Sequence, residues 1–428
     1  MTDSRSRNLS LRFGAGVQEA LLPHHWNMFM PGNAAPPARR SGHDIIQEAL
    51  REPIGAPPLR NVIRGGNIVV LVPDKTRRAA SDLVLPLLLD ELTAAGVRDE
   101  QVSILFATGT HAGQSPEERA ALLGEGIMRR YRVVEHDSRD TEASVYVGRT
   151  KYGTPILLNR LVVEADLVLI AGTVVHHYFA GFGGGPKMFL PGVAAYESAV
   201  ANHRRTITEQ GTFHPACRDG NLVGNPVAED IADAVRFFPP SWYFAAILDE
   251  HEHVAAAVCG DLMQAHASAC ASVHDLYSVS LHRRYPLCIA SAGGYPKDVN
   301  LIQAHKALHH AAYTVEDGGA LICLAECPDG IGNSSFLEWF RYANAEDFRQ
   351  ALLHRYTMNA HTALALKEKT SRLRVILVTA LDADVVAAMG MEYAATLADA
   401  LELLTPMNDL TLDICVLRNA SLTVPVWS

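Results

Sequence analysis

The feature that most constrains the fold of this chain is a regular alternation of apolar runs and amphipathic segments between residues 67 and 171. The apolar runs have the length of buried strands, and a helical pattern such as that of residues 82–95 separates them. Ser115 to Glu118 has the residue types of a helix N-terminus with a capping box. The expected strands are residues 67–72, 102–107, 131–135 and 166–171. Strands and helices that alternate in this way form a doubly wound, largely parallel sheet, so the sequence predicts an α/β fold.

A second series of the same kind follows a long helix expected over residues 262–278. Its expected elements are strands at residues 287–291, 320–325, 374–379 and 413–417 and a helix at residues 299–312. Two α/β domains with largely parallel sheets are therefore predicted, an N-terminal domain over residues 1–270 and a C-terminal domain over residues 271–428. A cleft between two domains is a common place for a small-molecule site, and we expect the active site there.

Polar motifs follow three of the strands expected in the N-terminal domain. Asp74–Arg77 follows the first strand, Gly109–His111 follows the second, and Gly172–His177 follows the last. In open α/β sheets the carboxyl ends of the strands carry the ligand site, because loop amides and helix N-termini face that edge. We therefore expect these three loops to converge on one ligand.

A glycine triplet, Gly183–Gly185, stands before Pro186 and Lys187. Glycines let another group approach the backbone closely, and their amides can converge on an anion. The spacing is not that of a Walker loop. A tight surface turn with a solvated lysine is the simpler interpretation of the triplet alone. His177 and His203 flank Lys187 in the sequence, however, and this arrangement favours a binding site.

Four motifs stand together in this chain: DKTR at Asp74–Arg77, ATGTH at Ala107–His111, HHYFAGFGGGPK at His176–Lys187, and GGYPKDVNLIQAHKA at Gly293–Ala307. This set resembles the lactate racemase family of nickel-dependent 2-hydroxy acid racemases and epimerases, over most of residues 45–330. The resemblance implies inversion at C2 of a 2-hydroxy acid. It leaves the substrate open among lactate, larger aliphatic or aromatic acids, and sugar acids.

The family's reaction implies roles for two histidines. Removing the C2 hydrogen as a proton is difficult beside an ionised carboxylate, whereas its transfer as a hydride needs an electron sink and a base for the hydroxyl proton. His111 and His177 match the family's acid–base pair, and imidazole suits both roles near neutral pH. Other histidines are expected at the surface, among them His251, His253, His309 and His310.

The resemblance also implies a cofactor, the nickel-pincer nucleotide. Lys187 matches the lysine that holds this nucleotide through a covalent thioamide link, and His203 matches the imidazole that completes the coordination of nickel. A square-planar site with soft sulfur donors and one imidazole suits Ni(II). The residues alone offer only a lysine, a histidine and a glycine-rich loop.

Further residues match contact positions of the family. The cofactor-contacting motif falls on Asp74, Lys75, Thr76 and Arg77. The substrate positions fall on Arg77, Gln303 and Lys306, where a cation would pair with the carboxylate. Gln303 and Lys306 are three residues apart on an expected helix and therefore share a face.

Composition narrows the class of protein. The 428 residues carry a formal net charge of -10 without any long basic run, which argues against a nucleic acid or an anionic membrane as partner. The seven cysteines are scattered and indicate reduced core thiols without a zinc or iron–sulfur site. The N-terminus lacks an apolar signal region, and no run of about 18 apolar residues follows. We predict a soluble, cytoplasmic protein that acts on a small 2-hydroxy acid, and the oligomeric state stays open.

Two alternative functions remain open at the level of sequence. One is a zinc-type hydrolase that uses the same histidines, although the chain has no H-E-x-x-H helix. The other is a non-catalytic protein that binds the cofactor or a hydroxy acid. The first alternative predicts zinc without a covalent adduct, and the second predicts binding without isomerisation.

Overall fold

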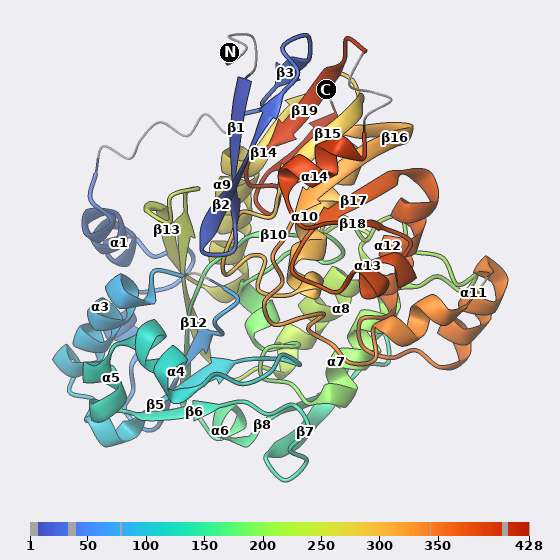
Figure 1. Cartoon of the computed structure of the whole chain (residues 1–428). Helices are drawn as coiled ribbons and strands as arrows, with labels where there is room; N and C mark the ends of the chain where they lie inside the picture. Colours follow the sequence, from blue (N-terminus) through green and yellow to red (C-terminus); the bar gives the residue numbers. More distant parts are fainter. Residues whose placement is uncertain (1–6, 33–39, 78, 343, 405–409, 428) are drawn as a thin grey trace. The chain divides into compact units, whose positions relative to one another are not determined.

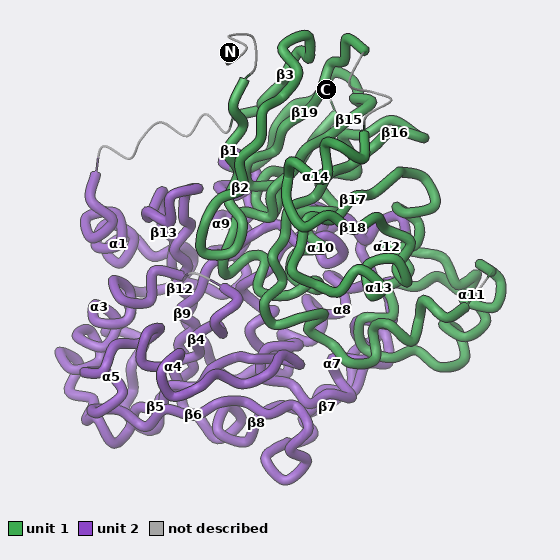
Figure 2. The backbone as a smooth tube through the Cα atoms, in the orientation of Figure 1, with its two compact units in different colours: residues 1–34, 207–214, 277–428 green, residues 35–206, 215–276 purple. Residues whose placement is uncertain are grey.

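The computed structural model describes residues 7–32, 40–77, 79–342, 344–404 and 410–427 (Figure 1). The chain forms two compact units (Figure 2). Unit 1 comprises residues 1–34, 207–214 and 277–428, and unit 2 comprises residues 35–206 and 215–276. Each unit is built on a six-stranded sheet.

The central sheet of unit 2 carries the loops of the expected site. Its strands are, in spatial order, β13 (Val254–Gly260), β12 (Ser241–Leu248), β9 (Leu167–Gly172), β4 (Ile68–Pro73), β5 (Val102–Ala107) and β6 (Arg132–Glu135). All pairings are parallel except that of β12 with β13. The chain order reverses at β4, because β5 and β6 lie on one side of it and β9 and β12 on the other. Ligands of open α/β sheets bind at the carboxyl ends of the strands at such a reversal.

Helices and two small strand pairs complete unit 2. The helices are α1 (Gly42–Arg51), α2 (Leu59–Val62), α3 (Ser81–Ala94), α4 (Pro116–Leu123), α5 (Glu125–Arg130), α6 (Arg160–Val163), α7 (Tyr196–His203), α8 (Pro226–Ala234) and α9 (Leu262–Tyr277). The small antiparallel pairs are β7 (Ser144–Arg149) with β8 (Pro155–Asn159) and β10 (His176–His177) with β11 (Gly181–Phe182). Every residue of β4 and β9 is buried, as in central strands whose two faces are both covered.

Unit 1 contains a fully parallel sheet. Its strands are, in spatial order, β18 (Glu392–Ala394), β17 (Arg374–Val378), β16 (Val315–Leu324), β15 (Tyr285–Ser291), β19 (Asp413–Leu417) and β3 (Asn27–Phe29). Unit 1 also contains α10 (Leu301–Tyr313), α11 (Ala345–His354), α12 (Ala360–Arg372), α13 (Ala383–Ala388), α14 (Leu397–Glu402) and the parallel pair β14 (Ser278–Leu281) with β20 (Val424–Trp427). Alternate residues of β15, β16, β17 and β19 enter two different apolar clusters, one on each face.

An N-terminal hairpin covers one face of the unit 1 sheet. It consists of β1 (Arg7–Phe13) and β2 (Gly16–Leu22), which pair antiparallel. Leu9 and Leu11 of β1 are buried with Ile289 and Ile322 of the sheet, because the strand alternates apolar and polar residues. The first 34 residues therefore group with unit 1, which differs from a division of the chain at residue 270.

The predicted α/β class with two largely parallel sheets is confirmed. The strands expected between residues 67 and 171 are all present, and so is the helix expected at residues 82–95. The two small strand pairs of unit 2 were not predicted, because two-residue strands and irregular segments give no periodic signal.

The expectation that His309 and His310 lie at the surface is wrong. Both side chains are buried in α10, which is covered on nearly all sides, and the ring Nδ1 of His310 lies 2.6 Å from the carbonyl oxygen of Ala420. His251 and His253 are exposed as expected.

The seven cysteines are buried and form no disulfide. The expected core location of these thiols is therefore confirmed. Within the described ranges, no helix combines the length and apolar character needed to cross a membrane.

The capping box of α4 provides a test of this local structure. The amide of Glu118 donates to Oγ of Ser115 at 3.2 Å, and the amide of Ser115 donates to Oε2 of Glu118 at 2.8 Å. Ser115→Ala removes the first of these bonds, so we expect the free energy of unfolding to fall by about 1 kcal/mol. Thermal unfolding followed by circular dichroism should show a Tm lower by about 2–4 °C.

Ser81→Ala is the matched control. Ser81 is the first residue of α3, and the N-cap of this helix is Ala80, which makes no side-chain hydrogen bond, so the substitution removes no capping bond. This variant should change the free energy of unfolding by less than about 0.5 kcal/mol. Equal Tm values for the two variants would contradict the role given to the capping box.

Candidate active site

The turn after β4 buries a carboxylate. The amide of Arg77 donates to the carbonyl oxygen of Asp74 at 3.0 Å, which closes the turn. Oδ1 of Asp74 accepts hydrogen bonds from the amide of Thr76 at 2.9 Å and from its hydroxyl at 2.6 Å. These local bonds fix the carboxyl group and leave Oδ2 for a partner from another loop.

That partner is His111, in the loop after β5. Oδ2 of Asp74 lies 2.5 Å from Nδ1 of His111. Burial by itself would raise the pKa of Asp74, but the charge and hydrogen bond of His111, together with Arg77 and Thr76, hold it well below its usual range. Asp74 is therefore ionised at neutral pH and fixes Nδ1 of the imidazole, which makes Nε2 the nitrogen available for proton exchange. The side chain of His111 is 37% exposed, so a solute can reach it.

The two cations of the same turn have different surroundings. Nζ of Lys75 donates to Oε1 of Glu118 at 2.7 Å, at the first turn of α4. Arg77 is half-buried, and its Nη1 donates to the carbonyl oxygen of Thr76 at 3.2 Å. Burial lowers the pKa of Arg77 from its ordinary value, while the Asp74 charge opposes this shift.

The glycine triplet follows β11 and approaches other backbone closely. Gly184 has a φ of 72°, and a Cβ at this position would lie 2.1 Å from the carbonyl oxygen of Thr173. A Cβ on Gly185 would lie 2.3 Å from Cδ2 of His266 on α9. Both positions therefore require glycine.

His266 of α9 contacts the backbone of the glycine triplet. Its Nε2 lies 3.2 Å from the carbonyl oxygen of Gly183, and since a carbonyl only accepts, Nε2 carries the proton. Burial lowers the pKa of His266 to about 4, so the ring is neutral at pH 7.

Lys187 presents a buried amine directly after the triplet. Its Nζ is inaccessible to solvent and has no hydrogen-bond partner in the described part of the chain. Nζ lies 5.3 Å from the centroid of the Phe179 ring. Burial, and after it the positive charge of Arg77, lowers the pKa of Lys187 from its ordinary value of 10.5 to about 7. A substantial fraction of this amine is therefore neutral and nucleophilic at physiological pH.

The ring of Phe179 brings together three of the predicted site residues. The imidazole of His177, on β10, lies edge-on to it with centroids 4.3 Å apart. The imidazole of His203, the last residue of α7, lies 5.0 Å from the same ring, and Lys187 approaches it as well. Both histidines are buried. The two imidazoles and the amine are thus grouped around one aromatic side chain.

The loop of His111 is joined to this group through the backbone. The amide of Gly109, whose φ is 57°, donates to the carbonyl oxygen of Gly192 at 2.8 Å, just beyond Lys187 in the chain. The positive charge of Arg77 contributes, after burial, to the lowered pKa of Lys187. The three loops expected to converge are therefore neighbours at one edge of the unit 2 sheet.

Gln303 and Lys306 lie on α10 of unit 1. Nζ of Lys306 donates to Oε1 of Gln303 at 2.5 Å, which confirms that the two side chains share a helix face. The amide of Gln303 donates to the side chain of Asn300, the N-cap of this helix. Their contact with a substrate stays a prediction.

No pattern in the sequence indicated a role for Phe179 or His266. Phe179 lies within the quoted HHYFAGFGGGPK motif, where a single aromatic residue is indistinguishable from a core residue. His266 lies in a helix without any motif. Only the folded chain brings these side chains to the glycine loop.

The arrangement offers an ionised carboxylate with an imidazole and, in the same unit, a nucleophilic amine beside two further imidazoles. Such a set can exchange protons near neutral pH and can form a covalent link through the amine.

Lys187→Met should stabilise the apoprotein, because methionine fills a similar volume without a desolvated amine. The folded pKa of about 7 lies below the ordinary 10.5, so between these pH values the unfolded chain holds a proton that the folded chain lacks. This amine therefore adds to the stability of the wild type as pH rises from about 7 to 10.5, and the variant lacks this contribution. We expect a Tm about 3 °C higher or more for the variant at pH 6.5, roughly 1 kcal/mol, and a smaller difference at pH 9.

Lys75→Met is the control, because Lys75 is paired with Glu118. This substitution should leave Tm unchanged or lower it at both pH values. A stabilisation by Lys187→Met that is independent of pH would show that the buried amine is not the cause.

Known proteins are similar to this chain over most of its length. The family described as Lactate racemase N-terminal domain matches residues 13–214, and that described as Lactate racemase C-terminal domain matches residues 282–424. A lactate racemase of Thermoanaerobacterium thermosaccharolyticum is 34% identical over 317 residues, 74% of this chain and 73% of that protein. A lactate racemase of Lactiplantibacillus plantarum is 33% identical over 373 residues, 85% of this chain and 86% of that protein.

Solved structures show the same fold. The lactate racemase apoprotein from T. thermosaccharolyticum superposes with a TM-score of 0.86 at 29% identity, covering 98% of this chain and 100% of that one. A Thermotoga maritima protein superposes with a TM-score of 0.70 at 19% identity, covering 94% of this chain and 100% of that one, which concerns the fold alone. The extent of the sequence matches, at both ends of the chain, shows that this protein belongs to the lactate racemase family and supports its assignment as a racemase, an isomerase.

Proposed function

We propose that this protein inverts C2 of a 2-hydroxy acid with the help of a nickel-pincer nucleotide held by Lys187. The observation that carries the proposal is the buried amine of Lys187, which has a lowered pKa and no hydrogen-bond partner in the described part of the chain. An amine in this state is suited to a covalent link. His177 and His203 lie around the same phenylalanine ring as this amine.

The residues present fit the cofactor. Close backbone packing at Gly184 and Gly185 leaves no room for side chains where the chain enters Lys187. The described residues contain no group of three His, Cys, Asp or Glu side chains that could hold a metal. His203 would contribute its imidazole to nickel, and the nucleotide would supply the remaining donors, soft sulfur among them. When bound, the nucleotide supplies an acceptor for the hydride on C2.

His111 and His177 would exchange the proton of the C2 hydroxyl group. One imidazole would take this proton from one enantiomer, and the other would donate a proton to the carbonyl oxygen of the planar keto acid as the hydride returns to the opposite face of C2. Asp74 orients the ring of His111 through Nδ1, so that Nε2 meets the hydroxyl group. We therefore propose that Asp74 acts chiefly through His111.

The other predicted residues would bind and orient the substrate and the cofactor. Arg77, Gln303 and Lys306 would hold the substrate carboxylate, because a guanidinium and an ammonium are its natural partners. Lys75 and Thr76 would contact the cofactor, with Lys75 fixed by Glu118. A cytoplasmic location stays a prediction of the sequence.

Lactate is the first substrate to test, since both curated relatives are named lactate racemase. Larger aliphatic, aromatic and sugar 2-hydroxy acids are the next. Each should be offered as a single enantiomer and followed by chiral chromatography.

The cofactor can be tested by intact mass and nickel content of the protein purified from cells that make the nickel-pincer nucleotide. We expect an adduct of a few hundred daltons on Lys187 and about one nickel per chain, because one amine and one imidazole form the site. Lys187→Met, prepared from the same cells, should carry no adduct.

An unmodified wild-type chain without nickel would contradict the proposal. Ligand binding without isomerisation would then support a binding protein, and zinc without an adduct would support a zinc-type hydrolase.

The acid–base roles can be tested by single substitutions. His111→Ala and His177→Ala should each lower kcat by about 100-fold or more, the usual contribution of a general acid or base, while nickel content stays unchanged. His251→Ala is the control, because this side chain is 64% exposed and remote from the motifs. Turnover within about threefold of wild type for either site variant would show that this histidine has no acid–base role.

A further inference from the structure

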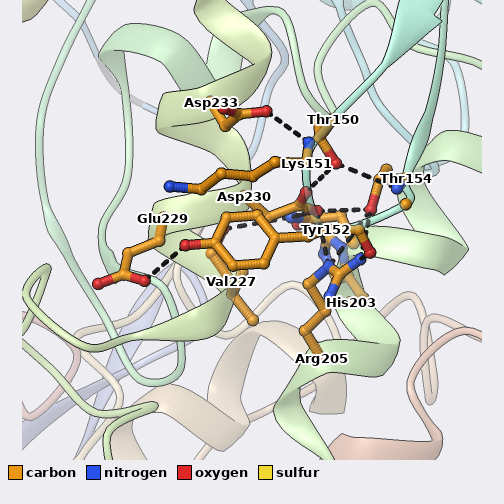
Figure 3. Close-up of polar contacts among 12 residues, drawn as sticks. Thr150, Lys151, Tyr152, Thr154, His203, Arg205, Val227, Glu229, Asp230 and Asp233 are labelled. Atoms are coloured by element: carbon orange, nitrogen blue, oxygen red, sulfur yellow. Dashed lines mark hydrogen bonds and ion pairs between the residues drawn. The ribbon is translucent and has the colours of Figure 1, made fainter.

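The carboxylate of Asp230, on α8, lies at the centre of a buried polar network (Figure 3). Its Oδ1 accepts a hydrogen bond from the hydroxyl of Thr150 at 2.6 Å. Its Oδ2 accepts from the hydroxyl of Thr154 at 2.7 Å and from Nδ2 of Asn202 at 2.9 Å. Nε of Arg205 lies 2.9 Å from the same oxygen. A fully buried carboxylate needs such pairing, so every one of these groups is held in place by it.

Two of these partners flank His203 in the chain. Asn202 precedes it directly and Arg205 follows two residues later, where α7 passes into the short helix η3 (Arg204–Thr206). The hydroxyl of Thr206 donates to the carbonyl oxygen of His203 at 2.7 Å. The backbone that carries this imidazole is therefore fixed on both sides.

Helix α7 does not determine this geometry by itself. It has eight residues, and its N-cap, Ala195, provides no side-chain hydrogen bond. A helix of this length is marginal without tertiary contacts. The imidazole of His203 contacts the ring of Phe179, and the Asp230 network supplies the contacts that hold the backbone.

The network also joins this turn to the connection between β7 and β8. Nη2 of Arg205 donates to the carbonyl oxygen of Tyr152 and, at 3.1 Å, to the hydroxyl of Thr154. Nδ2 of Asn202 donates in addition to the carbonyl oxygen of Val227 on α8 at 3.2 Å. One carboxylate thus couples the end of α7 to two neighbouring elements.

We propose that Asp230 is a positioning residue for His203: through Asn202 and Arg205 it holds the end of α7 so that the imidazole points to the metal site. The inference rests on the proposed function, in which His203 binds nickel. Asp230 itself would contact neither metal nor substrate.

The test measures deuterium exchange at C2 of the His203 imidazole, which reports the surroundings of this ring in the apoprotein. The tryptic peptide Met188–Arg204 contains His203 as its only histidine, and Val133–Arg139 contains only His136. His136 is also buried in unit 2, with Nε2 2.9 Å from the carbonyl oxygen of Ala194, so it reports general loosening of that unit. In Asp230→Asn we expect exchange at His203 to change by about threefold or more while exchange at His136 stays within about 1.5-fold of wild type.

Thr150→Val is the matched control, because it removes one bond to Asp230 and leaves both contacts that flank His203. Its exchange at His203 should stay close to that of wild type. If Asp230→Asn does not fold, Asn202→Ala replaces it, with the same expectation at His203. Unchanged exchange at His203, or equal changes at His203 and His136, would overturn the inference.

A second readout separates this inference from the proposed function. In protein loaded with cofactor, Asp230→Asn should keep the adduct on Lys187 but retain less than about a third of the nickel of the wild type. A wild-type chain without adduct or nickel would contradict the proposed function, and exchange in the apoprotein would still decide the role of Asp230. Full nickel retention in Asp230→Asn would overturn the positioning role.

Discussion

The close approach of Gly184 to the carbonyl oxygen of Thr173 is the constraint on which the site depends. After β9 the chain forms the β10–β11 pair and then returns to Thr173, the residue that follows β9. The backbone comes so close there that only glycine fits at position 184. His266 then closes the loop from the other side. Because the backbone turns here, Lys187 enters the interior of the unit.

Burial of the Lys187 amine makes this group more nucleophilic than a lysine amine in water. An ammonium group in this position would lack the solvation it has in water, so the neutral form is favoured and the amine becomes a nucleophile. The Asp74–His111 pair shows the opposite case, since there a buried charge is retained because an imidazole and a turn pair with it. One sheet edge therefore holds two titratable groups whose pKa values are lowered by different causes, desolvation for Lys187 and pairing for Asp74.

The sequence predicted those parts of the structure that repeat or that end a strand. The alternating elements from residue 67 to residue 171 are periodic, and the motifs of Asp74, His111 and His177 follow buried strands, so the sheet topology brings them to one edge. The contacts of Phe179 and the pairing of Asp230 depend on tertiary neighbours that no local pattern specifies. His309 and His310 were assigned to the surface for the same reason, because burial of a polar helix face is decided by what packs against it.

The pairing of β3 with β19 has a consequence for the order in which the parts of the protein can fold during synthesis. Asn27 lies opposite Asp413 in a parallel ladder, so β3 pairs with a strand whose residues follow it by 386 positions in the chain. Unit 2, formed by residues 35–206 and 215–276, has left the ribosome by then. Residues 27–29 are therefore synthesised before an entire α/β unit that separates them from their partner strand, and unit 1 acquires this edge strand only by closing a loop with a sequence separation of 386 residues.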